Sequence, residues 1–147
     1  MNIRWFASAA ILGAAMFGAP SLLQAQNAAR SIWDGVYTAA QADRGKAQYL
    51  QNCARCHGQS LDGSDEVPPL QGAHFTANWD GQTVADLVHR IYTTMPMDNP
   101  GHLSIATATD LVAFLLASNQ IPAGSAELTS NPPGQSQIRI DTNKPAK

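Results

Sequence analysis

The sequence of 147 residues contains only two cysteines, and both lie in the short segment Cys53-Ala54-Arg55-Cys56-His57. A disulfide framework normally closes long loops between distant cysteines, so this pattern does not indicate a disulfide-stabilised scaffold. Charged residues make up only 14% of the chain, the net charge is −2, and no run of basic residues occurs. This composition indicates no nucleic-acid partner.

Strand signals are also lacking, because the pattern of apolar and polar residues shows helical spacing instead. We predict three helices. The first begins near Gln41. The second begins at a capping box formed by Thr83 and Asp86, and it stops before Pro96. The third covers residues 105–118. One stripe of the first helix contains Gly45, Tyr49, Cys53 and Cys56.

An uncharged apolar run near the N-terminus, from Trp5 to Phe17, follows the positive charge of Arg4. It is too short for a membrane span, which takes ~20 residues. With the small residue Ala25 before a cleavage point, it resembles a secretory signal peptide of residues 1–25. An uncleaved membrane anchor is the alternative. We therefore expect an exported, periplasmic protein of Gram-negative type, without membrane insertion after signal cleavage.

The rest of the chain falls into three parts of different composition. Residues 26–40 form a polar, alanine-rich extension, residues 41–126 contain the three predicted helices, and residues 127–147 are polar and contain prolines. The length suits a single domain, which we place at 41–126. We expect the polar C-terminal tail to be mobile.

The segment from Cys53 to His57 has the pattern C-x-x-C-H, the attachment motif of c-type haem. Cysteines three apart at a helix end project to one side, where each thiol can add to one vinyl group of the porphyrin. His57 then supplies an imidazole nitrogen as the proximal iron ligand. Because haem attachment takes place outside the bacterial cytoplasm, the export signal supports this interpretation. We predict one covalent haem c, bound by Cys53, Cys56 and His57.

Other uses of a C-x-x-C segment fit this sequence less well. A thioredoxin-type redox motif needs a preceding strand, and here a helix precedes the cysteines. A zinc site needs four ligands, but His74, His89 and His102 are 13 or more residues apart and form no close pair. A plain surface disulfide would leave the adjacent histidine unexplained.

Two methionines remain once the signal is removed, Met95 and Met97, and both lie in the loop after the second helix. A thioether ligand there would complete a His/Met iron, which favours electron transfer. Filling of the core is the ordinary role of methionine. We prefer Met95 because it continues the helix face of Ile91 and precedes Pro96, with Met97 as the second choice. A histidine ligand or an open sixth position remains an alternative.

The residues around the motif resemble the class I mono-haem cytochromes c. The stripe from Gly45 to His57 is similar to that family's N-terminal helix. Leu111 and Phe114 are similar to the apolar–aromatic pair of its C-terminal helix. The resemblance implies an all-α fold of three main helices around the haem. It also implies that the N-terminal and C-terminal helices cross closely at Gly45. The segment Pro68-Pro69-Leu70-Gln71-Gly72 resembles the family's P-x-L-x-G loop. By this resemblance, the Pro68 carbonyl accepts a hydrogen bond from His57.

A narrower resemblance comes from residues 32–38, from Asn78-Trp79 and from Thr93-Thr94-Met95-Pro96. These stretches are similar to cytochrome c proteins or domains associated with bacterial periplasmic dehydrogenases, including quinoprotein alcohol dehydrogenases. The resemblance implies that Trp79 lies at the haem. Its indole N–H would donate to a haem propionate, or its ring would only pack on the haem.

The expected function is electron transfer without conversion of a substrate. The donor would be a dehydrogenase, and the acceptor another cytochrome or a terminal oxidase, so the chain could also be the cytochrome subunit of an oxidoreductase complex. Residues 26–40 and 121–147 would then be candidate docking segments. The alternative is a haem enzyme or gas sensor with an open sixth position, such as a peroxidase. Peroxidases of this broad type usually carry two haem motifs, and this chain has one.

Overall fold

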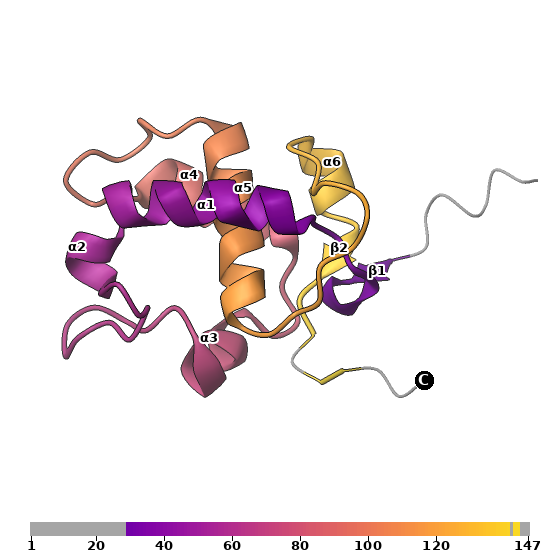
Figure 1. The fold of residues 1–147 in the computed structure, drawn as a ribbon, viewed down its shortest axis with the longest axis horizontal. Helices are drawn as coiled ribbons and strands as arrows, with labels where there is room; N and C mark the ends of the chain where they lie inside the picture. Colours follow the sequence, from indigo (N-terminus) through magenta and orange to yellow (C-terminus); the bar gives the residue numbers. More distant parts are fainter. Residues whose placement is uncertain (1–28, 142, 145–147) are drawn as a thin grey trace, which may run out of the picture.

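The computed structural model of the chain describes residues 29–141 and 143–144 (Figure 1). The predicted signal peptide of residues 1–25 lies outside the described residues. In the described part, no helix is long and apolar enough to cross a membrane. The elements in chain order are β1 (Arg30–Ser31), the 3-10 helix η2 (Ile32–Asp34), α1 (Ala39–Asn52), α2 (Ala54–His57), α3 (Gly72–Trp79), α4 (Val84–Thr94), α5 (Ile105–Ser118), α6 (Pro132–Gln135) and β2 (Ile138–Arg139).

The helices α1 and α5 cross in the centre of the molecule, as Figure 1 shows. At the crossing, a Cβ atom added to Gly45 would overlap the carbonyl oxygen of Asp110 and would lie 2.9 Å from the Cβ atom of Phe114. Only glycine permits this approach, since any other side chain would overlap the backbone of α5. The close crossing implied by the family resemblance is confirmed.

All three predicted helices are present as α1, α4 and α5. Helix α1 begins at Ala39, slightly before the predicted start, because the Thr38 hydroxyl caps it by accepting a hydrogen bond from the Gln41 N–H. The capping box of α4 is confirmed: Thr83 N–H donates to Asp86 at 2.9 Å and Asp86 N–H donates to Thr83 at 3.2 Å. The predicted end of this helix before Pro96 is also confirmed.

In the described part of the chain, the short helices α2, α3 and α6 and the 3-10 helix η2 were not predicted. Helix α2 is a short turn that follows Cys53, so the motif forms a separate element at the end of α1. Helix α3 occupies part of the stretch after His57 that shows no periodic pattern in the sequence. Phe75 is the one buried residue of α3, and a single apolar position gives no helical period.

The expectation of a mobile C-terminal tail is wrong for residues 127–141. Strand β2 pairs with β1 in parallel, at the end of the molecule opposite α2 (Figure 1). The Gln41 side chain holds the backbone of Leu128 with two hydrogen bonds, of 3.0 and 2.7 Å. Four side chains of this segment are buried, namely Leu128, Gln135, Ile138 and Ile140.

The extension before α1 is also part of the core. Ile32, Val36 and Tyr37 are buried, and the Tyr37 hydroxyl donates to the Ile121 carbonyl at 2.6 Å. The indole N–H of Trp33 donates to the Asp141 carbonyl at 2.9 Å. The two ends of the described chain therefore stabilise each other and the end of α5.

The contact at Gly45 predicts a strong effect of a very small substitution. Gly45→Ala adds one methyl group where the backbone of α5 leaves no room, and we expect it to lower the free energy of unfolding by about 2–3 kcal/mol. Denaturant unfolding followed by circular dichroism measures this change. Lys46→Ala, on the exposed side of the same helix, is the control and should stay within about 0.5 kcal/mol of the parent. A Gly45→Ala protein as stable as the parent would contradict the crossing.

Candidate haem site

A cavity of about 890 Å³ lies beside the C-x-x-C-H segment, within the ~300–1,000 Å³ typical of ligand pockets. It is bounded by the end of α1, by α2, α3 and α4, and by the loop after α4. Helix α5 contributes the buried side chains of Leu111 and Leu115. The structure brings all the predicted site residues to this cavity: Cys53, Cys56, His57, Pro68, Trp79, Met95 and Met97.

The cysteines are presented by the turn between α1 and α2. The Cys53 N–H still donates to the Tyr49 carbonyl of α1 at 2.8 Å, and the His57 N–H donates to the Cys53 carbonyl at 3.0 Å. Both thiols are free. Burial, with a smaller contribution from the Cys56 charge, raises the pKa of the Cys53 thiol to about 11. A thioredoxin-type motif needs the opposite shift, towards a reactive thiolate, so this alternative is disfavoured.

The imidazole of His57 is oriented by the loop that begins at Pro68. Its Nδ1 atom lies 3.0 Å from the Pro68 carbonyl oxygen, which can only accept, so Nδ1 carries the proton. This leaves Nε2 as the ring nitrogen with a lone pair for iron. In metal sites, a hydrogen-bond acceptor at the ring nitrogen that does not bind the metal sets the tautomer and the orientation of the histidine. The contact is the one that the family resemblance implied.

Tyr49 holds the backbone on the other side of His57. Its hydroxyl donates to the Gly58 carbonyl at 2.5 Å, and its ring lies 5.2 Å from the ring of Phe114. Burial raises the pKa of Tyr49 to about 12, with smaller contributions from Cys53 and Asp62, so the hydroxyl keeps its proton at neutral pH. The helical stripe predicted that Tyr49 faces the site, but its bond to Gly58 has no sequence signal.

The two methionines differ in burial. Met95 caps α4, with its N–H donating to the Ile91 carbonyl at 3.1 Å, and it is half-buried. Met97 is 81% exposed, although it also lines the cavity. The same loop carries Asp98, whose carboxylate forms an ion pair with Arg55 of the motif. This ion pair links the two segments that carry the predicted ligands, and the sequence did not predict it.

The other histidines separate into two groups. His89 is exposed, but it also lines the cavity, so a histidine does reach the site from α4. His74 and His102 do not line it; the ring of His74 contacts Asn78 at 3.1 Å, and that of His102 the Asn99 carbonyl at 3.0 Å. Trp79 is half-buried at the cavity wall, a position that suits either of its two expected roles.

The residues present fit a covalently bound haem. Two free thiols and an oriented imidazole line one cavity, whose walls include buried apolar side chains, and a thioether reaches the same cavity from another segment. Among residues 29–141 and 143–144, no three His, Cys, Asp or Glu side chains are arranged as ligands of a metal ion. The zinc alternative therefore has no support in this geometry.

The model of the family described as cytochrome C oxidase, cbb3-type, subunit III matches residues 40–115, more than half of the chain. The chain belongs to this cytochrome c family. The predicted resemblance to class I cytochromes c and the all-α fold of three main helices are thereby confirmed. A cytochrome c domain binds haem and transfers electrons, and this holds for the present chain.

A solved structure with the same fold is the sulfane dehydrogenase SoxCD from Paracoccus pantotrophus. The likeness has a TM-score of 0.51 and covers 88% of this chain and 68% of that chain, at 24% sequence identity. At this identity the likeness shows the fold alone. No curated protein matches the chain.

The hydrogen bond from Tyr49 to Gly58 predicts a local effect at the haem site. Tyr49→Phe keeps the ring and removes the donor, which leaves the Gly58 carbonyl without this partner, and we expect a loss of about 1–2 kcal/mol of stability. Tyr37→Phe, which breaks the bond to Ile121, is the matched control and should lose a similar amount. Only Tyr49→Phe should also shift the NMR signals of His57. Equal His57 spectra in the two variants would show that Tyr49 does not hold the motif.

Proposed function

We propose that the chain is a periplasmic electron carrier with one haem attached to Cys53 and Cys56 and with iron ligated by His57 and Met95. The observation that carries the proposal is the cavity that receives both the C-x-x-C-H segment and the loop after α4. In this role the protein carries electrons and converts no substrate. When bound, the haem supplies an iron that changes between two oxidation states, one electron at a time.

The side chains around the cavity divide this task. Pro68 holds the proton of His57 at Nδ1, so the other ring nitrogen keeps its lone pair. Leu87, Leu111 and Leu115 are buried and exclude water from one side of the cavity. Cys56 and Met97 are exposed cavity residues, so the cavity has an open edge that a redox partner can reach.

Met95 suits iron ligation better than Met97. A ligand must leave solvent and keep one position, and Met95 is half-buried at the end of α4, whereas 81% of Met97 is exposed. The thioether is also a neutral, soft ligand, and with histidine it raises the reduction potential of haem iron. A high potential favours the acceptance of electrons from a dehydrogenase.

The partners and the location are parts of the same proposal. Residues 32–38 and Trp79 resemble cytochromes that serve periplasmic dehydrogenases, and SoxCD, which shares the fold, is itself a dehydrogenase. The acceptor would be another cytochrome or a terminal oxidase. Residues 1–25 have the pattern of a signal peptide, which supports export to the periplasm.

The ligand choice is tested by the near-infrared charge-transfer band of Met-ligated ferric haem. We expect the band in the parent protein and in Met97→Ala, and its loss in Met95→Ala, because only the latter removes the iron-bound sulfur. Loss in Met97→Ala alone would reverse the assignment. Rapid carbon monoxide binding by the reduced parent, with no band, would favour an enzyme or gas sensor with an open sixth position.

The carrier role and the export are tested with protein expressed from the full sequence. We expect covalent haem protein in the periplasmic fraction, and haem-free protein in the cytoplasm when residues 2–25 are deleted. The purified ferric protein should be reduced by a periplasmic quinoprotein dehydrogenase together with its alcohol, but not by the alcohol alone. Absorbance of the reduced haem follows the reaction. Turnover of peroxide without electron acceptance from the dehydrogenase would contradict the carrier role.

A further inference from the structure

Asn119, the residue that caps the C-terminal end of α5, holds the loop before α3 with its side-chain amide. Its Nδ2 group donates to the Leu70 carbonyl at 3.1 Å, and its Oδ1 atom accepts from the Gly72 N–H at 2.9 Å. The same Nδ2 group donates to the Leu115 carbonyl of its own helix at 2.8 Å. The amide is thus held by α5, and it contacts the loop on both sides of Gln71.

This loop is the one that orients the predicted iron ligand. It begins at Pro68, two residues before Leu70, and the Pro68 carbonyl accepts from His57 Nδ1. On its other side the loop is held by Gln71, which donates to Asp62 at 2.7 Å, and by the Leu70 N–H, which donates to the Leu61 carbonyl at 2.8 Å. Asn119 is the contact that ties this loop to the buried helix α5.

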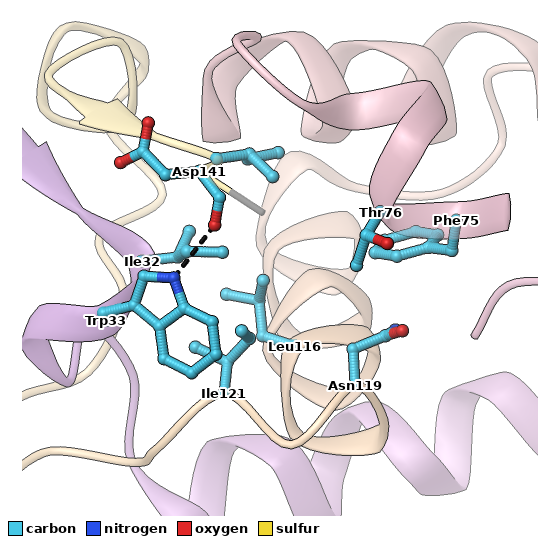
Figure 2. A pocket seen from close by; sticks show the side chains of 9 residues that line it. Ile32, Trp33, Phe75, Thr76, Leu116, Asn119, Ile121 and Asp141 are labelled. Carbon is cyan, nitrogen blue, oxygen red and sulfur yellow. Dashed lines mark hydrogen bonds between the residues drawn. The ribbon is translucent and has the colours of Figure 1, made fainter. Parts of the chain in front are cut away.

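Asn119 does not reach the large cavity. It lines a separate cavity of about 110 Å³ together with Trp33, Thr76 and Ile121. Figure 2 shows its side chain leaving α5 on the side of Phe75 and Thr76. Phe75 lines both cavities and lies between this position and the haem site. Asn119 therefore acts on the iron through the backbone that it contacts, which is that of the loop and that of Leu115.

We propose that Asn119 is a positioning residue that sets the hydrogen bond between Pro68 and His57 and thereby the reduction potential. The proposal rests on the proposed function, in which His57 ligates the iron. A hydrogen bond donated by Nδ1 makes the imidazole a stronger base, which stabilises ferric iron. When Asn119 no longer holds the loop, the bond weakens and the potential rises.

The test uses the haem-loaded protein and compares Asn119→Ala with Ser118→Ala. Ser118 is the adjacent residue, and its hydroxyl donates only within α5, to the Phe114 carbonyl at 2.9 Å. In Asn119→Ala we expect a higher midpoint potential than in the parent. We also expect the His57 Nδ1 proton to exchange with solvent roughly fivefold faster than in the parent, because this factor corresponds to the free energy of about one hydrogen bond. In Ser118→Ala both quantities should match the parent.

The outcomes separate this proposal from the proposed function. If the parent shows His57-bound iron and Asn119→Ala moves neither quantity beyond Ser118→Ala, Asn119 has no positioning role. If the parent shows no His57-bound iron, the proposed function itself fails. If Asn119→Ala does not retain haem, Asn119→Asp decides, because it keeps the acceptor for Gly72 and loses both donated bonds. An unchanged exchange rate of the His57 Nδ1 proton in Asn119→Asp overturns the proposal, and faster exchange supports it; the potential is not used for this variant because the added negative charge lowers it.

Discussion

The contact on which the rest of the structure depends is the crossing of α1 and α5 at Gly45. Because a hydrogen atom takes the place of a side chain there, the two backbones approach closely, and Tyr49 of α1 packs on Phe114 of α5. Tyr49 in turn bonds to Gly58, so the crossing is connected to the C-x-x-C-H segment by a direct hydrogen bond. The position of the candidate ligand His57 is thus set by helix packing and not by the loop alone.

The segments before α1 and after α5 support this crossing from outside. Gln41 in the first turn of α1 holds Leu128, Tyr37 holds Ile121, and the buried Gln135 amide donates to Thr109 of α5 at 2.9 Å. Each bond joins a side chain to a distant part of the chain. Loss of one partner would leave a buried polar group unpaired, and this costs more free energy than the hydrogen bond itself contributes. The extension and the described tail are therefore structural parts of the domain.

Local signals made much of the site predictable, and nonlocal contacts explain the rest. Periodicity and caps predicted α1, α4 and α5, and the spacing of Cys53, Cys56 and His57 was enough to indicate haem attachment. The buried tail was missed because its apolar residues, such as Ile138, lie in a polar context without a helical period. Asn119 was missed because its partners in the loop before α3 lie 47 and 49 residues away.

The two sides of the candidate site are held unequally. On the histidine side, the hydrogen bonds from Tyr49 to Gly58 and from Asn119 to Leu70 are partly buried, whereas the bond from His57 to Pro68 is exposed. On the methionine side, the loop leaves α4 after Met95, and its link to the motif is the solvent-exposed ion pair of Asp98 with Arg55. Exposed ion pairs contribute little stability. In the proposed carrier, the Met95 bond to iron is therefore the ligand bond that the fold constrains least.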